Sequence, residues 1–286
     1  MTGGVDGGFD VSVIIPTKNR RHLIDVQLVA LARQDFPTAF EVIVADNGSD
    51  DGTRDHVADH PLRDRLNLRW VDASEVPGAS HARNVGAQKA FGDLLLFCDD
   101  DDRVHDNWIS SMAHALRADF DVVGSTAREL LFDGRLADIP LIPEWPGMIG
   151  PVLGGSSIGC HAEVYRKLDG MNVEYLAGED NDFGWRAARD GFQVGYLTEA
   201  LVDYRSRVTT REAYRAGRGR GMSKAKLFAD HPDHGLPPIR LVTALVTLAR
   251  LAVSVHRIGP AFGMLAGHTV FEIRGGIRHR TLRWLW

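Results

Sequence analysis

The sequence predicts an α/β fold: a doubly wound, mostly parallel sheet flanked by helices, with a helical extension at the C-terminal end. Short apolar runs alternate with helix-length segments over residues 11–98, and each apolar run ends in turn-forming residues. Strands that alternate with helices form parallel sheets, because a helix carries the chain back to the start of the next strand. The whole sequence contains 44% hydrophobic and 25% charged residues, which is the composition of an ordinary globular protein.

The strands of the first half are predicted from short runs of β-branched and other apolar residues. Pro16 ends the first run, and the Gly- and Asp-rich segment 46–52 ends the second. We expect strands over residues 11–15, 40–45, 68–71 and 94–98.

Helices are expected between these strands. Pro61 follows the second helical segment and Gly92 follows the third, as is typical of helix ends. The predicted helices cover residues 22–34, 53–60 and 79–91.

The second half is less regular. Asp106 is the expected N-cap of a helix over residues 107–118, and a short strand is expected over 120–123. Residues 140–151 form a Pro-rich loop long enough to be a functional flap. Residues 154–159 are small and let backbone approach a ligand closely, but no Gly-Lys-Ser/Thr follows, so this is not a P-loop.

An acidic segment, residues 178–182, leads into a further predicted helix that ends near Gly191. Acidic residues are common in a first helical turn because they suit the helix dipole. Capping alone therefore explains Glu179 and Asp180 unless other observations indicate chemistry.

Charge is distributed unevenly along the chain. Residues 1–200 hold 18 Lys or Arg and 33 Asp or Glu, whereas residues 201–286 hold 15 and 5. The basic segment indicates either contact with an anionic surface or ligand, or a partner for the acidic body within the fold. The two cysteines imply no disulfide framework and fit a reducing compartment. Residues 1–9 are Gly-rich, lack signal-peptide features, and are expected to be a flexible tail.

Residues 236–286 are expected to form a separate helical region, because prolines at 232, 237 and 238 precede it. A helix over 241–255 is apolar, but it is too short and, with Arg250 inside it, too charged to be a secure membrane span. Residues 277–286 interleave basic residues with tryptophans. This composition suits either a membrane interface or a core-packing or dimer helix.

Four consecutive aspartates, 99–102, follow the apolar run 94–98. Two charges ~4 Å apart repel by roughly 4 kcal/mol at an effective dielectric of 20, so this cluster is either a solvated surface turn or a cation site. The carboxyl ends of parallel strands meet at one edge, where they bring together three polar segments: residues 17–19, 46–49 and 99–102. This convergence favours a divalent cation such as Mg²⁺ together with a phosphate-bearing ligand.

Five segments of the chain occur in a recognisable order. They are VSVIIPTKNR at 11–20, VIVADNGSDDGT at 42–53, GASHARNVG at 78–86, FCDDDD at 97–102 and GEDND at 178–182. Over roughly residues 10–207 they resemble the motifs of inverting family 2 glycosyltransferases of the GT-A fold. The resemblance implies a GT-A type domain over 10–230, with a nucleotide-binding half at 10–105 and an acceptor-binding half at 106–230.

The resemblance also implies which residues bind a nucleoside-diphosphate sugar. Asp46 accepts a hydrogen bond from the nucleobase, Thr17 lies near the base, and Arg83 lies near the base or the diphosphate. The donor-binding residues expected in this way are Pro16, Thr17, Asn19, Arg20, Asp46, Asn47, Arg83, Asp99 and Asp100.

The resemblance further implies a metal and a general base. Asp101 ligates Mg²⁺ or Mn²⁺, and Asp99 holds the ribose or a metal-bound water. Asp180, with Glu179 as the neighbouring candidate, takes the proton from the acceptor hydroxyl. Residues expected in an acceptor or donor loop are Gly155, Ser156 and Trp185.

One position departs from the family pattern. Many relatives carry a histidine after the last strand that completes the metal site, whereas this chain has Asp203 or Tyr204 there. The identity of a third protein ligand is therefore open between these residues, the diphosphate and water.

Other classes of function fit less well. A sugar-nucleotide pyrophosphorylase usually carries a Gly-rich loop after the first strand, and residues 16–20 contain no glycine. A dinucleotide oxidoreductase is disfavoured because no G-x-G-x-x-G follows an early strand. A non-catalytic nucleotide-sugar binder is the remaining alternative, against which the intact aspartates argue.

The expected partners follow from the resemblance and from the tail. They are a nucleoside-diphosphate sugar and a hydroxyl-bearing acceptor, which is a glycan, a lipid-linked sugar or a small molecule, with no nucleic acid. The expected location is the cytoplasm, where the basic tail is a candidate for peripheral contact with the inner face of the membrane. A homodimer is a further candidate partnership.

Overall fold

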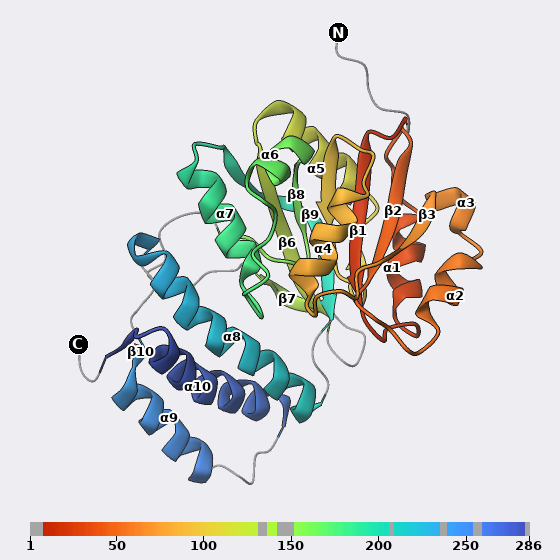
Figure 1. Ribbon diagram of the computed structural model, residues 1–286. Helices are drawn as coiled ribbons and strands as arrows, with labels where there is room; N and C mark the ends of the chain where they lie inside the picture. The colour runs from red at the N-terminus through yellow and green to blue at the C-terminus, as the bar shows by residue number, and fades with distance from the viewer. Residues whose placement is uncertain are drawn as a thin grey trace. The chain divides into compact units, whose positions relative to one another are not determined.

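The computed structural model describes residues 8–130, 136–141, 152–205, 209–234, 239–253 and 259–283. These residues form two compact units (Figure 1). Unit 1 takes the described residues up to 141, together with 152–173 and 180–205. Unit 2 takes residues 174–179 and the described residues from 209 onward.

Unit 1 is built on one mixed sheet. Its strands are β1 (Val11–Thr17), β2 (Phe40–Asp46), β3 (Leu68–Asp72), β4 (Leu94–Phe97), β5 (Arg103–Val104), β6 (Val122–Leu130), β7 (Leu136–Leu141), β8 (Ile158–His161) and β9 (Val194–Arg205). Within the described ranges, the strand order is β3-β2-β1-β4-β8-β6-β9-β5, and β7 pairs with β6.

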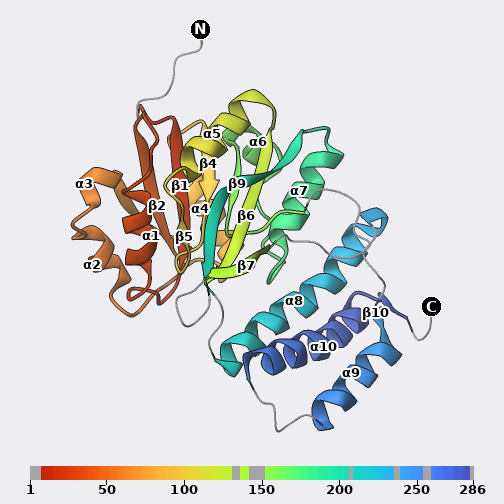
Figure 2. The ribbon, with the colours of Figure 1, turned by 180° about the vertical axis from the view of Figure 1, so that it is seen from behind.

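Helices lie on both faces of this sheet (Figures 1 and 2). They are α1 (Ile24–Leu31), α2 (Thr53–Ala58), α3 (Arg63–Leu66), α4 (Ala79–Gln88), α5 (Trp108–Ala118), α6 (Ala162–Lys167) and α7 (Glu179–Arg189). Successive side chains of β1 enter different cores: Val13 packs in one with Leu28 of α1 and Met112 of α5, whereas Ile14 packs in the other with Phe183 of α7. Burial on both faces explains why the central strands read as continuous apolar runs.

The first half of the fold confirms the predicted fold class. Strands β3, β2, β1 and β4 are neighbours and run parallel. Thr17 at the end of β1 is level with Asp46 at the end of β2. The residues that follow these strands therefore emerge at one edge of the sheet.

A mostly parallel sheet was expected, but the second half of the sheet is mixed. Strand β8 inserts between β4 and β6 and is antiparallel to both. Part of the expected small-residue loop is thus a strand. Gly159 belongs to β8, where a Cβ atom would lie only 2.7 Å from Leu96 Cδ2, so the small residue serves close packing of the sheet.

Two local expectations are corrected. Strand β6 starts at Val122 and runs to Leu130, well beyond the predicted end at residue 123. Helix α5 has Asn107 rather than Asp106 as its N-cap, and no side-chain capping hydrogen bond forms there.

Unit 2 is helical. It contains α8 (Thr210–Asp230), η1 (Pro232–His234), β10 (Ile239–Arg240), α9 (Leu241–Val253), α10 (Pro260–Arg278) and β11 (Leu282–Arg283). A capping box between Thr209 and Glu212 starts α8, which packs along α10. Helix α8 belongs to this unit, and unit 1 ends at Arg205; the expected glycosyltransferase domain over 10–230 stays a prediction.

Within the described part of the chain, no helix is both long enough and apolar enough to cross a membrane. Three expectations fall largely outside the described residues: most of the N-terminal tail, most of the flap over 140–151, and the two terminal tryptophans. The expected membrane or dimer contact of the tail stays a prediction.

Candidate active site

The ends of β1 and β4 are joined by a buried hydrogen bond. The Thr17 hydroxyl donates to Asp100 Oδ2 at 2.6 Å. Thr17 and Asp100 are 3% and 7% exposed. This bond fixes the turn after β1 against the aspartate segment, so two of the three expected segments meet in the structure.

The turns after β1 and β2 are also joined to each other. Asn19 has a left-handed backbone, with φ of 55°, and its N–H donates to Ser49 Oγ at 2.9 Å. In return, Asp50 N–H donates to Asn19 Oδ1 at 2.8 Å. Arg20 then reaches the aspartate segment, with Nη1 3.2 Å from Asp101 Oδ2.

Asp46 is buried at the end of β2 and its carboxylate is held at both oxygens. Oδ1 accepts hydrogen bonds from Ser49 N–H and Oγ at 2.9 and 2.6 Å, and Oδ2 accepts one from Trp70 Nε1 at 3.0 Å. Both lone pairs of Oδ1 are therefore engaged, whereas Oδ2 keeps one further lone pair. The carboxylate is thus fixed in one orientation at the edge of the sheet.

Asn47 supports the loop before α4. Its amide nitrogen donates to Ala73 O and Val76 O at 2.5 and 2.9 Å, and its Oδ1 accepts from Gly78 N–H at 2.8 Å. Both amide protons are therefore used within the protein. In this geometry Asn47 positions the loop, in place of the direct donor contact expected from the sequence.

The four aspartates face different surroundings. Asp99 is partly exposed, whereas Asp100, Asp101 and Asp102 are buried. The pKa of Asp100 is raised to about 7. Burial is the main cause, and the charges of Asp101 and Asp99 add to it, against the opposing effects of Thr17 and Arg20. Asp102 accepts a hydrogen bond from Arg205 N–H at 2.9 Å and so ties the segment to β9.

Arg83 of α4 links the aspartates to the segment before β8. The Arg83 side chain is 3% exposed, and its Nη2 lies 2.7 Å from Asp99 Oδ1 and 3.4 Å from Gly155 O. Gly155 N–H donates to Asp180 Oδ2 at 2.7 Å. A continuous series of contacts therefore runs from Asp99 through Arg83 and Gly155 to Asp180, residues that lie 81 positions apart in sequence.

The surroundings of Asp180 fix its carboxylate further. Oδ1 accepts hydrogen bonds from the Asn181 backbone N–H and side-chain Nδ2 at 2.7 and 2.9 Å. Asp180 is half-buried, and Glu179 is 9% exposed.

The remaining expected residues are mostly enclosed. Trp185 is fully buried, so in this structure it packs the interior and offers no ring face to a ligand. Ser156 is 9% exposed, and Pro16 is buried within β1.

Asp203 does not fit the role of a third metal ligand. Its side chain is fully buried, Oδ2 accepts from Arg103 Nε at 2.7 Å, and Oδ1 lies 2.8 Å from His105 Nε2. Arg103 and Asp203 are opposite each other in the β5–β9 ladder. The carboxylate is used to hold β5 on β9, which corrects this half of the expectation.

Sequence reasoning did not identify the partners that orient Asp46. Ser49 lies three residues after Asp46, a spacing at which an Asp side chain commonly accepts a backbone N–H, as at a helix N-cap, so this signal was present in the sequence. Trp70 carries no such signal, because it reaches Asp46 only through the pairing of β2 with β3.

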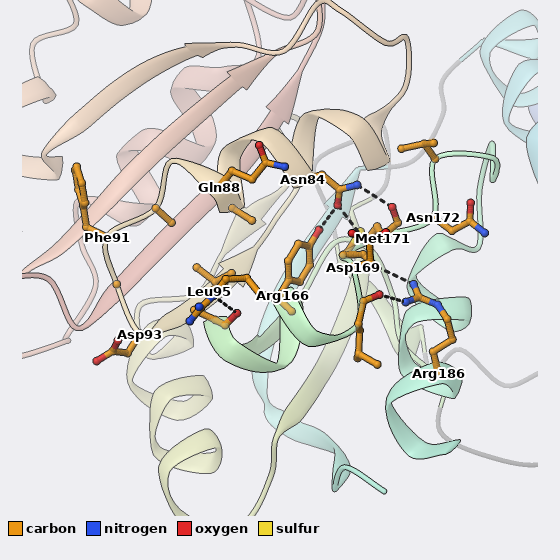
Figure 3. Close-up of a pocket in the computed structure, with 18 residues that line it drawn as sticks. Asn84, Gln88, Phe91, Asp93, Leu95, Arg166, Asp169, Met171, Asn172 and Arg186 are labelled. Carbon is orange, nitrogen blue, oxygen red and sulfur yellow. Dashed lines mark hydrogen bonds between the residues drawn. The ribbon is translucent and has the colours of Figure 1, made fainter. Parts of the chain in front are cut away.

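A cavity of about 900 Å³ lies elsewhere in unit 1 (Figure 3). Leu95 and Asp93, at the start of β4, line it, whereas the aspartates follow the end of that strand. Its wall is fixed by Asn84, which exchanges hydrogen bonds of 2.8 and 2.9 Å with the Met171 backbone. The cavity is therefore separate from the strand-end site.

Comparison with known families identifies the class of protein. Residues 12–135 match the family model "Glycosyl transferase family 2". The matched part of the chain includes the turns after β1 and β2, Arg83 and the four aspartates.

Among curated proteins, validoxylamine A glucosyltransferase of Streptomyces hygroscopicus subsp. limoneus is 45% identical over 91 residues, which cover 31% of this chain and 20% of that protein. The chain spans only 18 to 33% of the length of the first curated relatives that it matches.

Two solved structures share the fold over nearly the whole chain. A mannosyltransferase of Pyrobaculum calidifontis, in complex with GDP-Man and Mn²⁺, has a TM-score of 0.61 and 18% identity, covering 95% of this chain and 72% of that one. TarS 1–349 of Staphylococcus aureus, in complex with UDP-GlcNAc, has a TM-score of 0.57 and 19% identity, covering 96% and 93%. The expected GT-A fold is confirmed.

Proposed function

We propose that this protein is a metal-dependent, inverting glycosyltransferase that moves a sugar from a nucleoside-diphosphate sugar to an acceptor hydroxyl. The observation that carries the proposal is the series of contacts from Asp99 through Arg83 and Gly155 to Asp180. It supports a donor site and a base that share one edge of the sheet, which is where α/β proteins bind ligands.

The donor end of the site is assigned to the turns after β1 and β2. Asp46 is an acceptor-only group of fixed orientation, which suits an N–H group on a nucleobase edge. Arg83 carries a permanent positive charge beside Asp99, and its planar group suits diphosphate oxygens. The complexes of two proteins of this fold with GDP-Man and UDP-GlcNAc support a nucleotide sugar as donor.

The metal is assigned to Asp99 and Asp101. Carboxylate oxygens are the donors that Mg²⁺ and Mn²⁺ prefer, and Asp99 is the partly exposed member of the cluster. Burial is the main cause of the raised pKa of Asp100, and the charges of Asp101 and Asp99 add to it; a divalent cation would offset these charges. When bound, the metal supplies Lewis-acid neutralisation of the leaving diphosphate. The Mn²⁺ in the mannosyltransferase structure supports this choice.

Asp180 is assigned as the general base. Its carboxylate takes the proton as the acceptor oxygen attacks the anomeric carbon, and the bond from that carbon to the diphosphate oxygen breaks in the same step. Glu179 is the neighbouring candidate for this role. A single base without a covalent intermediate gives inversion at the anomeric carbon. The hydrogen bonds from Gly155 and Asn181 hold the carboxylate in place for this task.

The substitution Asp180→Asn tests the assignment. It keeps the shape of the side chain but removes the base, so we expect kcat to fall by ~10²–10⁴-fold while the Kd for the nucleotide changes less than about threefold. Product formation is followed by mass spectrometry and nucleotide binding by calorimetry. Asp190→Asn, an exposed site just beyond α7, is the matched control and should keep full activity. Full activity in Asp180→Asn would contradict the assignment.

A further inference from the structure

A second group of metal-binding side chains lies outside the strand-end site. Asp25 in the first turn of α1, His56 in α2 and His60 just after α2 come together, and one ligand atom from each lies within 4.8 Å of the others. The Nε2 atoms of His56 and His60 lie 2.6 and 3.3 Å from the same oxygen, Asp25 Oδ1. The two imidazole rings are 5.4 Å apart and nearly perpendicular.

We propose that Asp25, His56 and His60 form a zinc site that joins α1 to α2. Two imidazole nitrogens and one carboxylate form a ligand set that zinc accepts, with water completing the tetrahedron. In a tetrahedral site with bonds of ~2.0–2.1 Å, neighbouring ligand atoms lie about 3.3 Å apart. The distance from His60 Nε2 to Asp25 Oδ1 already has this value, and His56 needs to move by less than ~1 Å.

Exposure and helix geometry suit a bound ion at this place. His60 is 6% exposed and His56 is 22% exposed, whereas Asp25 is 53% exposed, so the carboxylate side is open to water ligands. The four-residue spacing of the histidines brings them to one side of a helical turn. Imidazole ligands favour Zn²⁺ over Mg²⁺ or Mn²⁺, which separates this site from the all-carboxylate cluster of the donor site.

The helices that carry this site directly follow, along the chain, the turns assigned to the donor. Helix α1 follows the turn after β1, and α2 follows the turn after β2. These turns are already joined by Asn19, Ser49 and Asp50, and by the Arg21 N–H, which donates to Asp51 Oδ2 at 3.0 Å. A zinc ion would add a cross-link between the two helices and hold both turns at a fixed separation.

Metal binding also has a specific consequence for His60. Its Nδ1 accepts a hydrogen bond from Leu62 N–H at 3.2 Å, so the neutral ring carries its proton on Nε2. With zinc on Nε2 the proton moves to Nδ1, and the bond from Leu62 must break. The Leu62 amide resonance and the His60 ring nitrogens are therefore direct reporters of zinc at this site.

The experiment titrates metal-stripped full-length protein with Zn²⁺ alone, in competition with a chromophoric chelator. We expect one tight zinc per chain, and a loss of more than ~100-fold in affinity in the double variant His56→Ala, His60→Ala. The control His22→Ala removes an exposed histidine beside α1 and should bind zinc like the wild type. Far-UV circular dichroism confirms that each variant is folded.

A second variant separates this site from the aspartate cluster. Asp101→Asn should keep the tight zinc, and the Leu62 amide of the wild type should shift on zinc addition. Weak zinc binding by the wild type, unchanged binding by the double histidine variant, or loss of the tight zinc in Asp101→Asn would each overturn the proposal.

Discussion

Arg83 is the cation around which the candidate active site is arranged. It is almost fully buried and reaches both Asp99 and the carbonyl of Gly155 through one guanidinium nitrogen. Lysine would keep the charge but lose the planar, multi-donor geometry. The two contacts of Arg83 therefore depend on its shape as well as on its charge.

We predict that Arg83→Lys lowers kcat/KM by ~10²–10³-fold, the usual cost of losing one donor aimed at developing charge. The control is Arg33→Lys, an exposed position just after α1, which should leave kcat/KM unchanged. Steady-state kinetics of both variants gives the answer, and a change of less than threefold in Arg83→Lys would remove Arg83 from the proposed mechanism.

Single residues also show where sequence reasoning reached its limit. Thr17, Arg83, Asp99 and Asp180 were expected in one site, and they are connected through direct contacts or neighbouring segments. The contacts of Asp203 could not be predicted from the sequence in the same way. Its partners Arg103 and His105 lie about a hundred residues earlier, and only the pairing of β5 with β9 brings them together.

At the scale of elements, glycines allow α8 and α10 to pack unusually closely. A Cβ atom at Gly217 or Gly221 of α8 would lie 2.2 Å from a carbonyl oxygen of α10. A Cβ at Gly263 or Gly267 of α10 would lie 2.3 Å from a carbonyl oxygen of Thr210 or Tyr214. These positions need a hydrogen in place of a side chain, because the opposing atoms belong to backbone.

We predict that Gly221→Ala destabilises unit 2 by about 1–3 kcal/mol or more, since the helices must move apart to admit the methyl group. Gly219→Ala is a matched control on the same helix, because the atom nearest to its Cβ, Leu176 O, would lie 3.4 Å away. That variant should instead gain up to ~1 kcal/mol from helix propensity. Chemical denaturation of both variants makes the comparison, and equal stability would contradict the close packing of α8 on α10.

A polar cluster attaches the segment before α7 to α8. Lys226 Nζ lies 2.8 Å from Glu174 Oε2 and 2.9 Å from Asp230 Oδ2, and the Tyr175 hydroxyl donates to Asp230 Oδ2 at 2.7 Å. Burial by itself raises the pKa of Asp230, but the hydrogen bonds from Lys226 and Tyr175 outweigh it, so the pKa lies below its usual value of 3.8.

A lowered pKa means that ionised Asp230 stabilises the fold above pH ~4, and that this stability is lost as the pH falls below the usual carboxyl range. We predict that Asp230→Asn costs about 1 kcal/mol at pH 7, discounted for partial exposure, and less near pH 3. Urea denaturation at both pH values tests this. An equal loss at pH 3 and pH 7 would show that the charge of Asp230 is not responsible.

The sheet itself was predictable only in part. Strands β1 to β4 are local apolar runs bounded by turn residues, so the strands predicted from the sequence pattern lie where the structure has them. The short strands β5 and β8 carry little pattern of their own, and they pair with distant partners. Their assignment depends on contacts across the whole of unit 1, which no local window of sequence contains.

At the scale of the whole molecule, the uneven distribution of charge along the sequence largely follows the division into two compact units. Most of the basic C-terminal segment belongs to unit 2, whereas the aspartate cluster and Asp180 belong to unit 1. The contact of the basic tail with a membrane stays a prediction. The proposed chemistry involves residues of unit 1, apart from Glu179, the alternative base.

The central claim is that the strand-end site binds a nucleoside diphosphate together with a divalent metal. The most direct test measures the melting temperature of the full chain with UDP, GDP, dTDP and CDP, each with and without Mn²⁺. Ligand at ~100 times its Kd stabilises the fold by about 2.7 kcal/mol. We predict a Mn²⁺-dependent rise with one of the nucleotides, absent in Asp101→Asn. No rise with any nucleotide would contradict the claim.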